Sequence, residues 1–133
     1  MPHPRSEYRV ELDGERCFVT DRGVPLELPR AWTPEHVLAA LIRCTFLSLA
    51  YHAQRAHAKV SSASGSARGA IAQREDGLYA FVEIDCDLDV RIEPPPADVA
   101  ELLTKAERGC FIGSSLAAKP RYRWRVNGAG AAA

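Results

Sequence analysis

Val82-Glu-Ile-Asp-Cys-Asp-Leu-Asp-Val-Arg-Ile-Glu93 is the stretch of sequence that decides the fold. Every second residue in it is apolar, and every residue between them is charged. This alternation has the period of a β-strand, in which successive side chains point to opposite faces. One apolar face and one charged face are typical of an antiparallel sheet that is covered on one side only. Three prolines, at positions 94–96, end the pattern.

A long helix is predicted before this strand, from Pro34 to about His57. Thr33 is a suitable N-cap, Pro34 suits the first helical position, and Glu35 suits the positive end of the helix dipole. Charges are few until Arg55, so we expect this helix to be buried on most of its sides. Its apolar residues recur at helical spacing: Val37, Leu38, Leu41, Ile42, Phe46 and Leu49.

A second amphipathic helix is predicted after the three prolines. Val99, Leu102, Leu103 and Ala106 form one apolar stripe along it. Cys110 follows Val99 by three helical turns, so we expect it to join that stripe.

The remaining segments complete an α+β domain in which helices pack on an antiparallel sheet. Strands are expected at residues 8–12, 17–20 and 26–28, and residues 61–68 are either a weak strand or a turn. A last strand places Tyr122, Trp124 and Val126 on one face and arginines on the other. If it adjoins residues 82–93, the two charged faces can exchange ion pairs. We expect one domain over residues 1–127 and a flexible Gly/Ala tail over 128–133.

Composition narrows the class of protein. The chain has 133 residues with 17 acidic and 17 basic side chains, so net charge suggests neither a nucleic-acid nor a membrane partner. We find no apolar run of about 18 residues that would span a bilayer, and the first residues lack the apolar stretch of a signal peptide. The expected location is the cytoplasm.

Four cysteines are spread along the chain: Cys17, Cys44, Cys86 and Cys110. None forms a C-x-x-C pair, which disfavours zinc and thioredoxin-like sites. His52 and His57 are five residues apart and do not share a helical face, so no metal or other cofactor is expected. Spacing alone gives each cysteine the role of a small buried hydrophobe, most clearly for Cys86 on the inward face of its strand.

Two segments change this interpretation for Cys44 and Cys110. Pro34-Glu-His-Val-Leu-Ala-Ala-Leu-Ile-Arg-Cys-Thr45 resembles the first-cysteine helix of the OsmC/Ohr family (osmotically inducible protein C and organic hydroperoxide resistance protein). Ala106-Glu-Arg-Gly-Cys-Phe-Ile-Gly-Ser-Ser-Leu116 is similar to the family's second-cysteine segment. The 66-residue separation of the cysteines and the order of elements also suit the family.

The resemblance implies an OsmC-like fold, an intertwined homodimer and a peroxidase site at the subunit interface. Cys44 would attack an organic hydroperoxide and become a sulfenic acid, and Cys110 would condense with it to a disulfide. An external dithiol would then reduce that disulfide.

The family also uses an arginine and a glutamate beside the first cysteine. Glu35 matches the glutamate, and Arg16, in Gly14-Glu15-Arg16, is chosen over Arg22 and Arg30. Arg16 would hold the peroxide and stabilise the departing alkoxide, and Glu35 would orient Arg16. The plainer alternatives are a surface arginine in a turn and a glutamate that serves only the helix dipole.

The segments depart from the family at Phe111, where proline is usual, and at Arg43, where a small residue is usual. We expect Phe46, Leu49 and Phe111 to line an apolar pocket that favours bulky peroxides over hydrogen peroxide. The alternative function is a non-catalytic OsmC-like dimer that binds an apolar small molecule or a partner protein. Its cysteines would be structural or redox-sensing.

Overall fold

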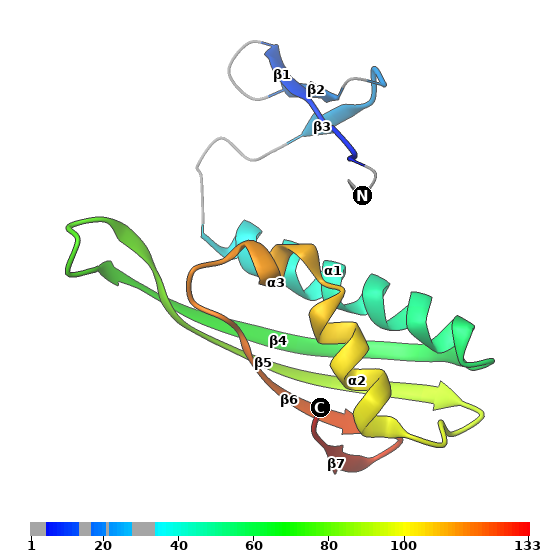
Figure 1. Ribbon diagram of the computed structural model, residues 1–133. Helices are drawn as coiled ribbons and strands as arrows, with labels where there is room; N and C mark the ends of the chain where they lie inside the picture. The colour runs from blue at the N-terminus through cyan, green and yellow to red at the C-terminus, as the bar shows by residue number, and fades with distance from the viewer. Residues whose placement is uncertain (1–4, 14–16, 21, 28–33) are drawn as a thin grey trace. The chain divides into compact units, whose positions relative to one another are not determined.

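The computed structural model describes residues 5–13, 17–20, 22–27 and 34–133 (Figure 1). The chain divides into two compact units, Met1–Pro34 and Glu35–Ala133, and each is described by itself. The expectation of one domain over residues 1–127 stays a prediction. The first unit is a three-stranded antiparallel sheet with the order β1-β2-β3. Its strands are β1 (Val10–Asp13), β2 (Cys17–Thr20) and β3 (Pro25–Glu27).

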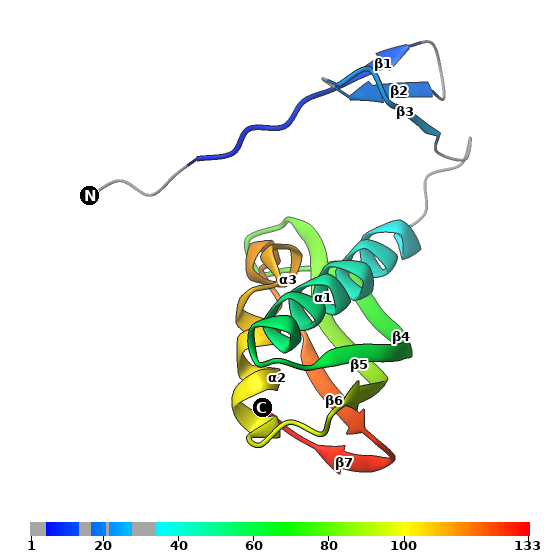
Figure 2. The same ribbon diagram turned by 90° about the vertical axis from the view of Figure 1, so that its right-hand side faces the viewer.

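The second unit is a four-stranded sheet with helices on one face, as Figures 1 and 2 show. The strands lie in the order β4-β5-β6-β7, and only the β5–β6 pair is parallel. This confirms the predicted α+β class, with antiparallel pairing dominant. The elements are α1 (Glu35–Arg55), β4 (Lys59–Gln73), β5 (Tyr79–Glu93), α2 (Val99–Arg108), α3 (Phe111–Ser115), β6 (Arg121–Val126) and β7 (Ala129–Ala131).

Strand β5 carries the predicted alternation. Its inward side chains are at most 3% exposed from Ile84 to Ile92, and the charged residues between them face away from the core. Val82 departs from the pattern and is 44% exposed. The end of the β4–β5 hairpin extends beyond the helices in Figure 1, so the inner face of the sheet is uncovered there.

The outer face of this sheet carries the predicted ion pairs. Arg121 on β6 contacts Glu83 at 2.8 Å and Asp85 at 2.9 Å, both on β5. Arg68 on β4 contacts the same Asp85 at 2.6 Å. The expected ion pairs between these two strands, β5 and β6, are therefore confirmed.

Helix α1 differs from its prediction in burial and in length. Its fully buried residues form a single stripe at a spacing of four: Leu41, Thr45, Leu49 and Ala53. Leu47 and Tyr51 are 62% and 56% exposed, so the expectation that most sides are buried is wrong for the single chain. The helix ends at Arg55 because His57 has a left-handed backbone (φ 61°).

Helix α1 is also long and apolar enough, by length and composition, to cross a membrane. This corrects the expectation that no run reaches that length. Its fully buried stripe belongs to the hydrophobic core of the second unit, as in the central helix of a packed domain. We assign it to that core.

Cys110 does not continue the second helix. Helix α2 ends at Arg108, and Cys110 has an extended backbone as the N-cap of α3. A Cβ on Gly109 would lie 2.6 Å from the Ser48 hydroxyl of α1, so the position after α2 has little room for a side chain. The prediction of a continuous stripe is wrong, although Cys110 is fully buried.

Residues 61–68, whose structure was left open, belong to the long strand β4. Their Ser, Ala and Gly composition is not typical of a strand. One of these residues, Gly65, occupies a position that has room only for glycine. A Cβ on Gly65 would lie 2.5 Å from the carbonyl oxygen of Asp87 on the paired strand.

The predicted flexible tail at 128–133 contains strand β7, which pairs with β6. Asn127 and Gly128 both have positive φ, 52° and 84°, as the two central residues of a tight type I′ hairpin require. The Asn127 side chain also accepts from the Ile92 amide at 2.9 Å and donates to the Ile92 carbonyl at 3.1 Å. The Asn-Gly pair was the sequence signal for this hairpin, and the tail prediction overlooked it.

Candidate active site

The fold brings Cys44 and Cys110 into contact. Cys44 lies in the middle of α1 and is partly exposed, whereas Cys110 is 0% exposed at the start of α3. Both are free thiols, and Cys110 lies near enough to Cys44 to raise the pKa of Cys44. The two cysteines selected by the resemblance therefore meet, although 66 residues separate them.

The start of α3 faces the Cys44 sulfur. The backbone amides of Ile112 and Phe111 hydrogen-bond to it and favour the thiolate. Burial of Cys44 opposes them and is the largest influence, joined by the hydrogen bond and the charge of Cys110. The net result is that the pKa of Cys44 is raised above its ordinary value. These residues hold the thiol in place but do not by themselves make it a thiolate at neutral pH.

The Cys110 sulfur lies among three polar groups. The Thr45 hydroxyl on α1 is 3.3 Å away, and the Gly113 amide on α3 donates to the sulfur at 3.4 Å. The thiol can itself donate to the Leu41 carbonyl, a longer contact at 3.9 Å. Sulfur is a weak acceptor as a thiol and a much stronger one as a thiolate.

Thr45 connects this sulfur to the sheet. It is 0% exposed, and its Oγ1 lies 2.9 Å from the Leu41 carbonyl and 3.2 Å from the Tyr122 hydroxyl of β6. Burial raises the pKa of Tyr122 well above its ordinary value, so the phenol keeps its proton at neutral pH. The protonated Tyr122 hydroxyl can donate to Thr45 Oγ1 or accept from it, and it forms one end of a buried hydrogen-bond chain that ends at Cys110.

Thr45, Tyr122 and Gly113 are site residues that sequence reasoning missed. Thr45 was visible as one hydroxyl in an otherwise apolar stripe, directly after Cys44. Tyr122 was correctly placed on the inward face of the last strand, but nothing in the sequence paired it with Thr45.

Cys86 has a different environment. It is 1% exposed among the apolar residues of the core, as its strand position predicted. Burial, the largest cause, raises its pKa to about 11. The side chain of Cys17 lies outside the described residues. Within the described ranges, no three His, Cys, Asp or Glu side chains gather as a metal site would require.

The predicted charged pair is not assembled in the described residues. Glu35 is exposed in the first turn of α1. It precedes Cys44 by nine residues, which places it on the opposite side of the helix and about 13 Å along the axis. Arg16 and Arg30 lie outside the described residues, and Arg22 is exposed in the first unit.

The three predicted substrate contacts do not form one pocket wall. Leu49 is fully buried in the core, Phe46 packs partly against that core, and Phe111 is 69% exposed beside Cys110. Arg43 is exposed. The substrate-binding roles of Phe46, Leu49 and Phe111 stay predictions.

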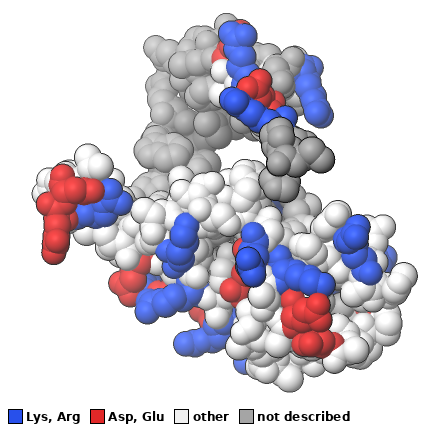
Figure 3. Space-filling model, viewed as in Figure 1, with Lys and Arg blue, Asp and Glu red and all other residues white. Residues whose placement is uncertain are grey.

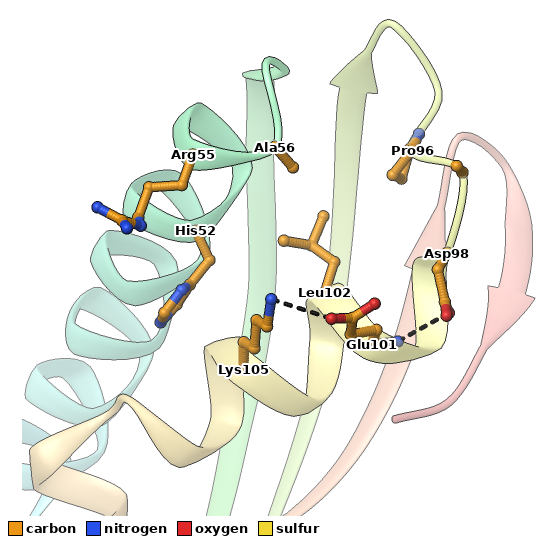
Figure 4. Close-up of a pocket in the computed structure, with 9 residues that line it drawn as sticks. His52, Arg55, Ala56, Pro96, Asp98, Glu101, Leu102 and Lys105 are labelled. Carbon is orange, nitrogen blue, oxygen red and sulfur yellow. Dashed lines mark hydrogen bonds and ion pairs between the residues drawn. The ribbon is translucent and has the colours of Figure 1, made fainter.

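A pocket of about 630 Å³ lies instead between the end of α1 and the start of α2 (Figure 4). Its polar groups are already engaged with the protein. Lys105 pairs with Glu101 at 3.0 Å, and Asp98 accepts from the Glu101 amide at 3.0 Å. Arg55 is directed away from these residues in Figure 4 and stacks on Tyr51. Figure 3 shows both signs of charge interspersed over the face that it presents.

Comparison with known proteins identifies the family. A model of the OsmC-like protein family matches residues 29–125. No protein of curated function matches the chain.

Solved structures share the fold at low sequence identity. An OsmC-like protein of unknown function from Vibrio cholerae is 16% identical, with a TM-score of 0.72 over 90% of this chain and 99% of that one. An organic hydroperoxide resistance protein from Elizabethkingia anophelis is 18% identical, with a TM-score of 0.62 over 92% and 96% of the two chains. One from Legionella pneumophila is 15% identical, with a TM-score of 0.59 over 93% and 98%. The chain belongs to the OsmC-like protein family.

Proposed function

We propose that the protein is a thiol-dependent peroxidase that reduces organic hydroperoxides. The observation that carries the proposal is the contact between the Cys44 and Cys110 thiols, one partly exposed and one buried. A partly exposed thiol can meet a peroxide, and a buried thiol close to it is a candidate to form a disulfide with it. The similar structures named for organic hydroperoxide resistance support the same chemistry.

The cycle has three steps. The Cys44 thiolate attacks the outer oxygen of the hydroperoxide, the O–O bond breaks, and an alcohol leaves after protonation. Cys110 then attacks the sulfur of the Cys44 sulfenic acid, which forms the disulfide and releases water. An external dithiol reduces the disulfide and is itself oxidised.

The first step needs a positive charge, and none of the described residues that influence the pKa of Cys44 supplies one. The raised pKa of Cys44 leaves little thiolate at neutral pH. We assign the charge to Arg16, in preference to Arg22 or Arg30. The orientation of its guanidinium by Glu35 stays a prediction, because Glu35 lies on the opposite side of α1 from Cys44. An arginine beside Cys44 would stabilise both the thiolate and the departing alkoxide.

The same proposal includes a homodimer. Leu47 and Tyr51 on the outer side of α1 are large, apolar and more than half exposed, as is Phe111 beside the thiols. A second copy that covers this side would exclude water from Cys44 and bring Phe46 and Phe111 into an apolar substrate pocket. Bulky peroxides would then react faster than hydrogen peroxide.

The direct test is dithiol-dependent consumption of cumene hydroperoxide. The wild type should consume it well above the rate of free dithiol, and Cys44→Ser should abolish the excess. Cys86→Ala is the matched control, since it removes a buried thiol outside the proposed cycle and should leave the rate within about twofold. A wild-type rate equal to the dithiol background would refute the peroxidase, and equal rates with hydrogen peroxide would refute the apolar pocket.

The second candidate is a non-catalytic dimer that binds an apolar small molecule or a partner protein. The raised pKa of Cys44 is the observation in its favour, because a thiol without an activating charge is slow to react. Alkylation of Cys44 by iodoacetamide distinguishes the two candidates. A titration midpoint above that of free cysteine supports the binding protein, and a midpoint below it supports the peroxidase with its arginine in place.

A further inference from the structure

We propose that Thr45 is a positioning residue for Cys110 in the disulfide-forming step, and that Tyr122 acts through Thr45. The inference rests on the proposed role of Cys110 and adds two residues to it. The observation that carries it is the buried chain from the Tyr122 hydroxyl through Thr45 Oγ1 to the Cys110 sulfur, with separations of 3.2 and 3.3 Å.

The chain joins three parts of the fold at one sulfur. Tyr122 belongs to β6, Thr45 to α1, and Cys110 to the junction that leads into α3. Gly113 fixes the sulfur from the other end through its amide, 3.4 Å away. A side chain held by donors from two elements keeps one rotamer, so the Cys110 sulfur is held in one position near Cys44.

The single proton of the Thr45 hydroxyl has two acceptors within reach. When the Tyr122 hydroxyl donates to Thr45 Oγ1, the Thr45 proton is available either to the Leu41 carbonyl at 2.9 Å or to the Cys110 sulfur. While Cys110 is a thiol, the carbonyl is the better acceptor. When Cys110 loses its proton, a charge-assisted bond to the sulfur becomes the stronger one. The hydroxyl can therefore rotate to stabilise the nucleophile at the moment it is needed.

The step that this arrangement serves is balanced without another reagent. The Cys110 thiolate attacks the Cys44 sulfur, the S–O bond of the sulfenic acid breaks, and the hydroxide takes the proton that Cys110 released. The products are the Cys44–Cys110 disulfide and water.

A second threonine in the chain separates positioning from helix packing. Thr104 on α2 donates to the Ala100 carbonyl at 2.9 Å, the same bond to the residue four positions earlier that Thr45 makes to Leu41. Thr104 is involved in no thiol contact among the described residues. A change of threonine to valine keeps the shape of the side chain and removes only the hydroxyl, so Thr104→Val is a matched control for Thr45→Val.

The test uses 5,5′-dithiobis(2-nitrobenzoate), which reports both cysteines without any peroxide. All proteins carry Cys17→Ser, so that Cys17 contributes no signal. Attack by Cys44 releases the first thionitrobenzoate, and attack by Cys110 on the mixed disulfide at Cys44 releases the second. Stopped-flow absorbance separates the two phases.

Thr45→Val should slow the second phase by about tenfold or more and leave the first within about twofold. Thr45→Ser, which restores the hydroxyl, should recover the second phase to within about threefold of the wild type. Tyr122→Phe should slow that phase by about threefold, and adding it to Thr45→Val should cause no further loss, because Tyr122 acts through Thr45. Thr104→Val should leave both phases unchanged.

An unchanged second phase in Thr45→Val would overturn the inference. So would equal slowing of both phases, or a Thr45→Ser variant as slow as the valine variant, since either indicates a packing role. Because no peroxide is present, the peroxidase is judged separately. A wild type that closes the disulfide and responds to Thr45→Val, yet does not consume cumene hydroperoxide, would refute only the peroxidase.

Discussion

Cys110 and Cys86 lie in the same hydrophobic core and are 0% and 1% exposed. We propose a redox role for Cys110 and none for Cys86. Cys86 sits among apolar side chains, and burial raises its pKa to about 11. Cys110 has the Thr45 hydroxyl and the Gly113 amide on its sulfur and the Cys44 thiol beside it. Burial alone therefore does not identify an inert cysteine. The hydrogen-bond donors on the Cys110 sulfur distinguish it from Cys86.

The largest expected difference between the two comes from their removal. Cys110→Ser should lower dithiol-dependent turnover of cumene hydroperoxide by about a hundredfold or more, because the Cys44 sulfenic acid is left without an internal partner. Cys86→Ser should leave turnover within about twofold once corrected for folded protein. Mass spectrometry after dimedone treatment should find the adduct on Cys44 in the Cys110→Ser variant. Equal losses in the two variants would break the comparison.

The second largest expected effect is on the unfolding free energy at high pH, where Cys86 is expected to contribute. A raised pKa in the folded state favours the neutral thiol, so Cys86 contributes stability that is full below the pKa of an unfolded cysteine and is lost as pH rises toward about 11. The unfolding free energy of the wild type should fall between pH 7 and pH 10.5. In Cys86→Ala this fall should be smaller by about 2 kcal/mol. Urea unfolding at the two pH values measures this difference. An identical loss in both proteins would mean that Cys86 titrates as it does in the unfolded chain.

Crowding around Cys110 gives a smaller effect. A Cβ on Gly113 would lie 3.3 Å from the Tyr122 hydroxyl and 3.7 Å from the Cys110 sulfur. We expect Gly113→Ala to lower the unfolding free energy by about 1 kcal/mol and to slow disulfide closure by a few-fold. Gly130→Ala is the control, because a Cβ there meets nothing within 4 Å. Chemical denaturation and the two-phase thiol assay check both, and faster closure in Gly113→Ala would show that the sulfur has room to spare.

The smallest effect is expected on the charged face of the sheet, where Arg121 pairs with Glu83 and Asp85. These side chains are solvated, so Arg121→Met should move Tm by no more than about 2 °C. Arg121 holds the pKa of Asp85 below its ordinary value. The contribution is therefore present above the pKa of an unfolded aspartate and disappears as pH falls through the lower folded value. Thermal melts at pH 7 and pH 3 check this, and a larger shift at pH 3 would contradict it.

Sequence patterns predicted the elements better than their contacts. The alternation in β5 and the helical spacing in α1 are local properties, and both could be predicted from the sequence. The proximity of Cys44 to Cys110 depends on the end of α2 at Arg108 and on the extended backbone of Cys110, and no local sequence pattern indicated either. The roles of the two cysteines came from the family resemblance.

Polar partners across the core were beyond prediction for the same reason. Thr45 and Tyr122 are 77 positions apart and meet only because their side chains reach the same core from α1 and from β6. The Asn127-Gly128 pair predicts the hairpin that leads into β7. The Gly and Ala composition of residues 128–133 instead suggested a flexible tail. The arginine assigned to the first step stays a prediction, because it depends on residues outside the described ranges.

The central claim is that Cys44 and Cys110 form the redox pair and Cys86 does not. It is tested most directly by adding about one equivalent of cumene hydroperoxide to the fully reduced protein and mapping the disulfides by mass spectrometry. The account predicts rapid formation of a Cys44–Cys110 disulfide, blocked by Cys44→Ser, with Cys86 still reduced. A protein that stays fully reduced after minutes, or one whose disulfide includes Cys86, would contradict it.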